Sequence, residues 1–466
     1  MNKIKYSINA TLAWTRRYGK FQVHQSEMTF VNTYLRILGT YIVQYGDEET
    51  KIPKEIEDIL SNLTIFSTVW SIGAALDENC RKKFSEFYIH LFNGSADIIA
   101  ENKLDPDYDM SPIVYGAKLP EKCHMFDMFY NAEKMIWQNW SQTQPAFVIP
   151  KKIPFNDLII PTNDSIRHNY FLHLNIKNHM HALFVGPTGT GKSINVSNEL
   201  SLHYYNETYT FLTTAFSGQT TANQIQRLID SKVCTRRRKG YFWPEAGKNE
   251  IVIFIDDLNM PIKEKYGAQP PIELLRQWMD GGGWYDLDTK ELKYLCGINY
   301  VSAMLPPVGG RNTVTMRYLR HFNLIYVEPF DNDSLFKIFG NILEWYFINL
   351  PQSLPKAITN LKENIVSSTI ELYTKVQTSK ELLPTPAKSH YIYNLRDLSK
   401  VFQGMTKASN KSFSSDNDFL KLWAHECSRT FKDRLISVQD QVFFEGLLKD
   451  IMKTNFKRDW GNLVTV

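Results

Sequence analysis

Apolar residues in the first hundred positions recur at intervals of three and four residues. The clearest case lies in segment 28–45, where the recurring positions are Met28, Val31, Leu35, Leu38 and Ile42. This spacing places the apolar side chains on one face of a helix and predicts that this face joins the core. Similar patterns cover 65–76 and 83–92, and Pro53 opens a further helix. The sequence therefore predicts a helical region over about residues 1–100.

Between 155 and 330, short apolar runs alternate with stretches of helical spacing. The runs are expected to be strands at 182–185, 209–213, 251–255, 298–304 and 324–327, with helices at 222–233 and 272–279 among them. Apolar strands separated by helices are typical of a parallel sheet that is covered on both faces. An α/β domain is therefore predicted here.

The regions on either side of this α/β segment differ from each other. Residues 93–154 are rich in Pro and contain Trp137 and Trp140, which predicts an irregular connector packed on a neighbour. Helical spacing returns at 331–456, with helices predicted at 333–346, 354–375, 395–405 and 418–435. The predicted layout is a helical domain (1–100), a connector (101–155), an α/β domain (156–330) and a second helical domain (331–456).

The composition restricts the class of protein. Of the 466 residues, 43% are hydrophobic and 22% are charged, which excludes disorder of the whole chain. The net charge of +4 is too small to indicate nucleic acid or an anionic membrane as the main partner. The longest aliphatic and aromatic run, Ile251–Ile255, is far shorter than a membrane span, and the N-terminus lacks the apolar segment of a secretory signal.

The cysteines are few and widely spread. They are Cys80, Cys123, Cys234, Cys296 and Cys427, an odd number with no CxxC pair. We expect reduced thiols in a cytosolic protein, and neither a disulfide framework nor a zinc site.

The sharpest motif is Gly-Pro-Thr-Gly-Thr-Gly-Lys-Ser, which fits the phosphate-loop pattern G-x-x-x-x-G-K-[ST]. Its glycines allow successive backbone N–H groups to face one concave loop, and the helix that follows adds its positive N-terminal end. Lys192 would contact the β and γ phosphates, and the Ser193 hydroxyl would complete the coordination of Mg²⁺. The alternative is a Gly-rich turn with a solvated lysine. The predicted nucleotide-binding residues are Gly186, Pro187, Thr188, Gly189, Thr190, Gly191, Lys192 and Ser193.

A pair of carboxylates follows the apolar strand Ile251–Ile255. In P-loop NTPases the first acid, here Asp256, supports Mg²⁺, and the second position, here Asp257, holds the acid that polarises the attacking water. Asp257 is one methylene shorter than the Glu common in this fold, which favours slow hydrolysis. The alternative is an Asp pair that caps a turn at the end of a strand.

Longer stretches resemble the dynein heavy chains, with the third AAA+ module of the axonemal type as the best match. They are Phe216–Gln224, Arg236–Gly240, Phe254–Pro261, Tyr266–Trp278, Gly309–Asn312, Arg317–Asn323 and Lys388–Asp397. Upstream, Phe66–Gly73 and Arg81–Phe87 resemble the end of the second module. The resemblance implies an α/β P-loop NTPase (AAA+) core with a parallel sheet and a helical lid, preceded by the helical lid-type domain of another module.

The resemblance also implies roles that spacing alone does not assign. Arg396 would be a second sensor arginine that reaches the phosphates from the lid, unless it is an exposed helix residue near Asp397. Arg320 would be an arginine finger acting in trans on the neighbouring module's nucleotide, with Arg317 as its competitor and a structural role as the alternative. Ile160 would touch the adenine, although a simple core turn fits equally well.

One feature of the family pattern is missing. A polar sensor residue is expected near the end of strand 298–304, but the residues there are Ala303, Met304 and Leu305. Together with Asp257, this absence predicts that nucleotide binding is retained while fast hydrolysis is not.

The implied function follows from the family. Cofactors would be ATP or ADP with Mg²⁺, and the motor would move toward microtubule minus ends in a cilium or flagellum, which places it in the cytoplasm, the cytoskeleton and the axoneme. Partners would be ATP and adjacent AAA+ modules, and, through parts not in this sequence, intermediate and light chains and microtubules. The chain would be a fragment of that motor or a truncated gene model.

Three interpretations of the module's role are compared. It would bind or slowly hydrolyse nucleotide in a regulatory role, or it would be a structural ring segment whose bound nucleotide never turns over. The basic run 236–239 could suggest a nucleic-acid remodeller, but a solvated face on a hairpin insert is the better interpretation. Neither nucleic acid nor membrane is expected as a partner.

Overall fold

The computed structural model describes residues 2–43, 54–93, 98–104, 123–145, 147–233, 236–238, 240–244, 248–308, 310–350, 354–409, 413 and 415–459. Pro53, Cys234, Lys239 and Gly309 lie outside these residues. The chain forms two compact units. The first comprises Met1–Gln144, Asn163–Pro187 and Gly191–Glu328, and the second comprises Pro145–Thr162, Thr188–Thr190 and Pro329–Val466.

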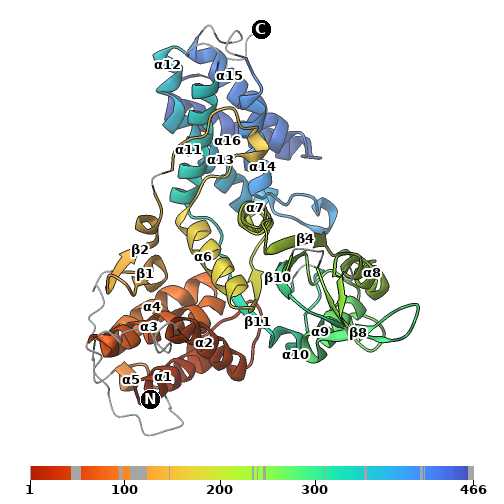
Figure 1. Ribbon diagram of the computed structural model, residues 1–466. Helices are drawn as coiled ribbons and strands as arrows, with labels where there is room; N and C mark the ends of the chain where they lie inside the picture. The colour runs from red at the N-terminus through yellow and green to blue at the C-terminus, as the bar shows by residue number, and fades with distance from the viewer. Residues whose placement is uncertain are drawn as a thin grey trace. The chain divides into compact units, whose positions relative to one another are not determined.

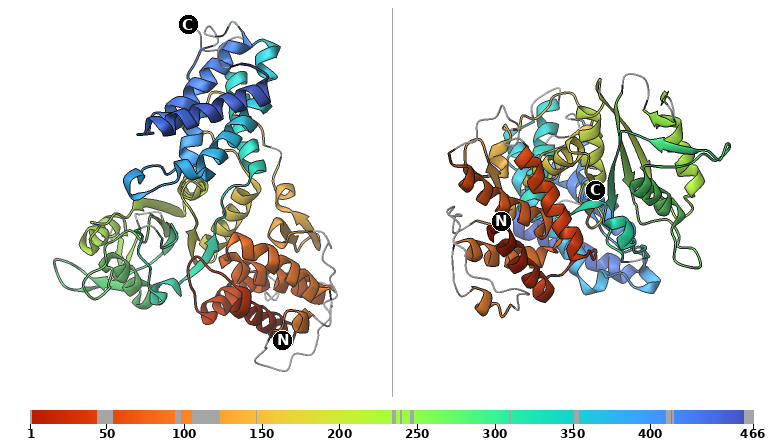
Figure 2. Two further views of the ribbon diagram at one scale, coloured as in Figure 1. Left: turned by 180° about the vertical axis from the view of Figure 1, so that it is seen from behind. Right: turned by 60° about the horizontal axis from the view of Figure 1, so that its bottom comes forward.

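The first unit begins with helices, as predicted. They are α1 (Asn2–Tyr18), α2 (Glu27–Ile42), α3 (Ile56–Ser71), α4 (Glu78–Phe92) and the short α5 (Ile98–Glu101), which lie together in the red and orange part of Figure 2. Side chains define where two of them begin: Ser26 caps α2 by accepting from the Thr29 N–H, and Asp77 caps α4 by accepting from the Cys80 N–H.

The predicted core face of α2 is only partly correct: Leu38 is buried and Val31 packs against a core, but other predicted positions are exposed. Met28 is 69% exposed and Leu35 is 54% exposed, whereas Phe30, Tyr34 and Ile37 are buried. The two stripes are adjacent on the helix, and the larger aromatic side chains occupy the core because they remove more apolar area from water. Periodicity alone located the helix, but it included exposed positions in the predicted core face.

A five-stranded parallel sheet forms the centre of the first unit, which confirms the predicted fold class. Its order is β11-β3-β10-β7-β4. The strands are β3 (His181–Val185), β4 (Tyr209–Ala215), β7 (Glu250–Asp256), β10 (Ile298–Met304) and β11 (Phe322–Tyr326).

Alternate residues of each strand enter different cores because successive side chains point to opposite faces. Phe184 and Phe254 pack with α6 (Asn163–Lys177) and α7 (Lys192–His203) on one face. On the other face, strand residues such as Ile253 pack with α8 (Ala222–Val233) and α9 (Pro270–Gly281). The short α10 (Met316–Leu319) precedes β11 (Figure 1).

Two small sheets, one mixed and one an antiparallel hairpin, were not predicted in full. The expected hairpin insert is present as β5 (Arg236–Arg238) and β6 (Tyr241–Trp243), and it extends into a four-stranded sheet with β8 (Gly283–Tyr285) and β9 (Leu292–Leu295). A second hairpin, β1 (Met128–Asn131) and β2 (Ile136–Asn139), lies in the connector. Trp140 follows it and is 1% exposed, so this part of the connector packs on the helices of the first unit.

The second unit is helical. It contains α11 (Asn332–Asn349), α12 (Lys356–Thr359), α13 (Lys362–Thr378), α14 (Leu395–Thr406), α15 (Asp416–Cys427) and α16 (Val438–Phe456) around one apolar core. The predicted helix 354–375 is divided into α12 and α13, and the predicted 418–435 ends in a π-helical turn, Ser428–Lys432. Among the described helices, none has the length and apolarity needed to cross a bilayer.

Candidate functional site

The loop after β3 has the backbone that a phosphate cradle requires. Gly189 and Gly191 have φ angles of 85° and 75°, in the left-handed region that favours glycine. Gly186 has no room for a side chain, because a Cβ there would lie 2.3 Å from the Val327 carbonyl oxygen. The glycines of the motif therefore shape the loop and hold it against the end of β11.

Helix α7 begins within this loop. Gly191 is its N-terminal cap and has no side chain, so no capping side chain occupies this end of the helix, where the helix dipole favours an anion. Lys192, the first helical residue, donates through Nζ to the carbonyl oxygens of Gly186 and Pro187, at 2.8 and 2.7 Å. Its ammonium thus lies over the loop that it is predicted to serve. Ser193 follows in the first turn of α7.

The two acids lie at the same edge of the sheet as the loop. β3 and β7 both run parallel to β10 and lie on either side of it. Gly186, just after β3, and Asp256, the last residue of β7, are therefore at the same edge, two strand spacings or roughly 10 Å apart. A nucleotide's phosphates and a hydrated Mg²⁺ fit between groups at this separation. The structure therefore brings the loop and Asp256 to one edge, as the motifs predict.

Asp257 has an unusual conformation and a defined partner. Its φ is 52°, a left-handed backbone that is uncommon for a residue with a side chain. Its Oδ1 lies 3.0 Å from Nη1 of Arg311, and its N–H donates to Oδ1 of Asp256. The sequence motifs assigned no role to Arg311, although it lies in the segment 309–312 that resembles the dynein heavy chains. An ion pair therefore holds the predicted catalytic acid in place.

A polar side chain does reach the end of β10, but it comes from another segment. All residues of β10 are buried, and Met304 ends the strand. Asn259, three residues after Asp256, donates through Nδ2 to the Leu305 carbonyl oxygen at 2.8 Å. Its Oδ1 is buried and has no hydrogen-bond partner among the described residues. The last two residues of the strand, Ala303 and Met304, are apolar, and Ser302 is the polar residue of β10 nearest to its end.

The finger candidate Arg320 is 55% exposed and belongs to a surface charge cluster. Its Nη2 lies 2.6 Å from Oδ1 of Asp280 on α9, and Arg276 also binds that carboxylate. Burial would raise the pKa of Asp280, but the hydrogen bonds from Arg320 and Arg276 outweigh it and lower the pKa. Arg317 is exposed. Arg320 is thus held on the surface of the first unit.

Two predicted residues lie in the second unit. Arg396 is exposed in the first turn of α14, and its backbone N–H donates to Oδ1 of the capping residue Asn394. The neighbouring Asp397 is buried and pairs with Arg434 and Lys400. Ile160 is 7% exposed and packs in the core of this unit, which favours the interpretation as a core turn.

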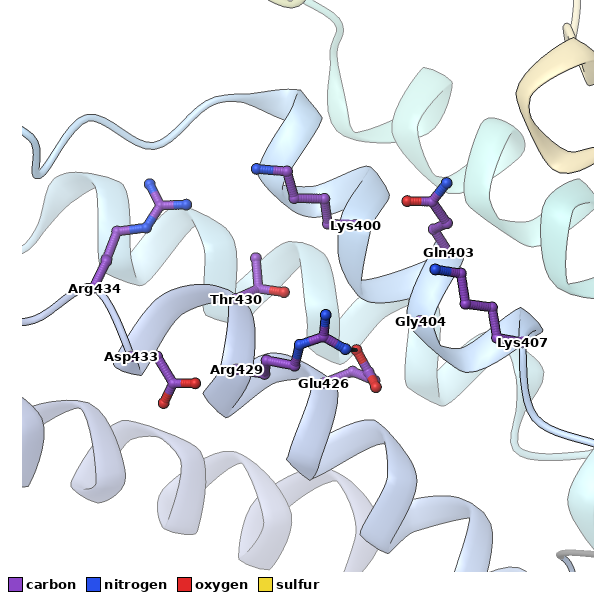
Figure 3. Close-up of a pocket in the computed structure, with 9 residues that line it drawn as sticks. All are labelled: Lys400, Gln403, Gly404, Lys407, Glu426, Arg429, Thr430, Asp433 and Arg434. Carbon is purple, nitrogen blue, oxygen red and sulfur yellow. Dashed lines mark ion pairs between the residues drawn. The ribbon is translucent and has the colours of Figure 1, made fainter.

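A cleft of about 510 Å³ also lies in the second unit, between α14 and the π-helical turn (Figure 3). Its basic residues include Arg429, which pairs with Glu426 inside the cleft, and Arg434, which pairs with Asp397. None of the residues predicted from the motifs lines it. Because acids already neutralise two of its cations, we assign it no role in the candidate site.

Three family models match consecutive parts of the chain. They describe a dynein heavy chain AAA lid domain (residues 2–142), a P-loop containing dynein motor region (147–330) and a dynein heavy chain ATPase lid domain (347–441).

Curated relatives align with most of the chain. Dynein axonemal heavy chain 1 of Mus musculus is 41% identical over 96% of the chain, and dynein axonemal heavy chain 3 of the same species is 36% identical over 97%. Dynein axonemal heavy chain 12 of Rattus norvegicus is 38% identical over 86%. The chain spans only 11–12% of the length of these relatives. Because three dynein models cover the chain in series and these relatives align along most of it, the chain belongs to the dynein heavy chain family.

Proposed function

We propose that this chain is an ATP-binding AAA+ segment of a dynein heavy chain, with Mg-ATP or Mg-ADP held by the loop 186–193. The observation that supports this most strongly is the geometry of that loop. It combines left-handed glycines, an uncapped helix N-terminus and a lysine that bends over the loop carbonyls. Anionic phosphates are the ligands that such an arrangement stabilises.

Each residue of the site would have a distinct task. Backbone N–H groups of Thr188–Ser193 and the Lys192 ammonium would hold the phosphates. Ser193 and Asp256 would hold Mg²⁺, which offsets phosphate charge when it is bound. Asp257 would orient and polarise the attacking water. Arg396 would report nucleotide state to the lid, and Arg320 would act on the nucleotide of a neighbouring module.

The wider role follows from the family. We propose that the chain contains the lid of a preceding second module (1–100), a connector (101–155) and the core and lid of a third module (156–330 and 331–456). The whole motor would drive ATP-dependent, minus-end-directed movement along microtubules in a cilium or flagellum. This module would bind or slowly hydrolyse nucleotide to regulate that movement, with adjacent AAA+ modules as its direct partners.

Calorimetric titration of the full chain with Mg-ATP and Mg-ADP tests the binding. We expect saturable binding of one nucleotide and a loss of roughly 10- to 100-fold in affinity for Lys192→Ala, since hydrogen bonds to charged groups contribute about 1.5–3 kcal/mol. Lys232→Ala, which changes an exposed lysine of α8, is the matched control. If the unaltered chain bound neither nucleotide, the proposal would be wrong.

The second candidate is a structural ring segment whose nucleotide never turns over. The Asp257–Arg311 ion pair supports it, because a carboxylate oxygen that is paired with a guanidinium is less accessible to the attacking water. Turnover should be measured in a longer chain that includes the neighbouring modules, since a finger acts in trans. ATP hydrolysis that disappears in both Lys192→Ala and Asp257→Asn would exclude this candidate, whereas retained nucleotide without hydrolysis would support it.

A further inference from the structure

Three side chains of the kind that bind transition metals meet between α6 and α7, which lie side by side (Figure 1). They are His173 on α6, and Glu199 and His203 on α7. Glu199 and His203 are four residues apart and therefore share one face of their helix. One potential ligand atom from each residue lies within 4.8 Å of the others.

The distances around Glu199 suit one shared ion. Nε2 of His173 lies 3.0 Å from Oε2 of Glu199, and Nε2 of His203 lies 3.5 Å from the same oxygen. Around a tetrahedral Zn²⁺ with ligand bonds of about 2.0–2.2 Å, neighbouring ligand atoms are roughly 3.3–3.5 Å apart. Both observed distances lie near this range. His203 is 56% exposed, so its ring has room to complete the approach.

The atoms that would not bind the ion are already held by hydrogen bonds. Nδ1 of His173 lies 2.8 Å from the Tyr204 hydroxyl, which orients the ring so that Nε2 faces Glu199. Oε1 of Glu199 accepts from Nδ2 of Asn169 at 2.7 Å, which leaves Oε2 toward the histidines. Partners of this kind orient metal ligands in proteins and tune their affinity.

We propose that His173, Glu199 and His203 form a binding site for a divalent transition metal, with Zn²⁺ as the best fit and water in the fourth position. Two imidazoles and one carboxylate suit Zn²⁺ and its neighbours in the transition series, while Mg²⁺ prefers oxygen ligands. This site is separate from the Mg²⁺ position of the proposed nucleotide site. Lys192 and His203 lie at opposite ends of α7, and eleven residues of helical rise separate them by roughly 16 Å.

The bound ion would fasten α6 to the far end of the helix that begins in the phosphate loop. The simpler alternative is a hydrogen-bond network that binds no metal, in which His173 donates to Glu199. The proposal does not depend on nucleotide binding, so the two can fail independently.

The test uses the full chain, stripped with a chelator and titrated with Zn²⁺ by calorimetry in the absence of nucleotide. We expect one Zn²⁺ per chain, binding that millimolar Mg²⁺ does not displace, and a rise in the thermal midpoint on binding. His203→Ala and Glu199→Gln should each weaken Zn²⁺ binding at least tenfold, and Tyr204→Phe by about tenfold because it removes the orienting hydroxyl.

His425→Ala is the matched control, because His425 is an exposed histidine in the last turn of another twelve-residue helix, α15. Its Zn²⁺ affinity should equal that of the unaltered chain. Circular dichroism checks that each variant folds. If Glu199→Gln does not fold, the result for His203→Ala decides the test, since the His203 side chain is mostly exposed and its removal should not disturb the fold. Absence of stoichiometric binding, or equal affinities for His203→Ala and His425→Ala, would overturn the proposal.

Discussion

His181 begins strand β3 with its ring close to the aromatic rings of Trp278, Tyr300 and Phe322. Burial lowers its pKa to about 4, although a hydrogen bond with Asn299 opposes the shift. Nδ1 lies 3.2 Å from the backbone nitrogen of Tyr300 and 3.4 Å from Oδ1 of Asn299. Because the ring is removed from water, the folded protein favours the neutral imidazole.

This histidine predicts a loss of stability in mild acid. The unfolded ring takes up a proton near pH 6.5 and the folded ring only near 4, so stability is complete above about 6.5 and falls as the pH drops between these values. The loss should be about 2 kcal/mol by pH 5. Urea denaturation at pH 7 and pH 5 measures it. His181→Gln should lose less over the same interval, and an equal loss in both proteins would contradict the assignment.

At the scale of elements, a buried charged cluster joins helix α4 to strand β11. Arg81 on α4 is 1% exposed, and its Nη2 donates to the carbonyl oxygens of Ala74 and Tyr326, both at 2.7 Å. Its Nη1 lies 3.1 Å from Oε1 of Glu328, just after β11, and Arg167 of α6 also pairs with Glu328. The helical region and the sheet thus share one set of buried charges.

Removing Arg81 should weaken the first unit strongly. Arg81→Ala leaves Glu328 without its best partner and two carbonyls without a donor, which should cost about 3–5 kcal/mol of unfolding free energy. Lys82→Ala changes the exposed next residue and should stay within about 0.5 kcal/mol of the unaltered chain. Chemical denaturation of both variants measures the difference, and similar midpoints for the two would show that the cluster does not stabilise this junction.

Elements differed in how well the sequence predicted them. Strand β10 was located to the residue and the other four strands of the sheet to within two residues at each end, because an apolar run between helices has few other interpretations. The buried face of α2 was predicted only in part, since two apolar stripes compete on that helix and only tertiary packing chooses between them. In the site, the loop glycines and Asp256 were predictable from spacing, whereas Arg311 was not, because 54 residues separate it from its partner Asp257.

At the scale of the whole molecule, the chain spans 11–12% of the length of its dynein relatives, and we expect some of its residues to act on a neighbouring module. Arg320 is the example, because Asp280 holds it at the surface. Its hydrogen bonds and ion pairs within the described residues join it to Asp280 and His321, and not to the loop 186–193. A residue placed in this way is suited to an interface with another module.

In a longer chain that contains the preceding module, Arg320→Ala should lower ATP turnover by about tenfold or more, as expected for a lost arginine finger. Nucleotide binding by the loop 186–193 of the same chain should be unchanged. Arg317→Ala, which removes the nearby exposed competitor, is the control. If Arg317→Ala reduced turnover and Arg320→Ala did not, the finger would be Arg317.

The left-handed backbone of Asp257 limits how this site can be improved by evolution or engineering. Asp and Asn tolerate such a conformation better than residues with longer side chains, so the short acid suits its backbone. Replacing it with Glu, to imitate strongly hydrolytic relatives, should cost up to about 1 kcal/mol and should not speed hydrolysis. Thermal denaturation measures the loss of stability in Asp257→Glu, and single-turnover assays measure its rate of ATP hydrolysis. A variant that is as stable as the unaltered chain and hydrolyses ATP faster would contradict the prediction. Gaining a fast ATPase here would thus require reshaping the strand end before changing the acid.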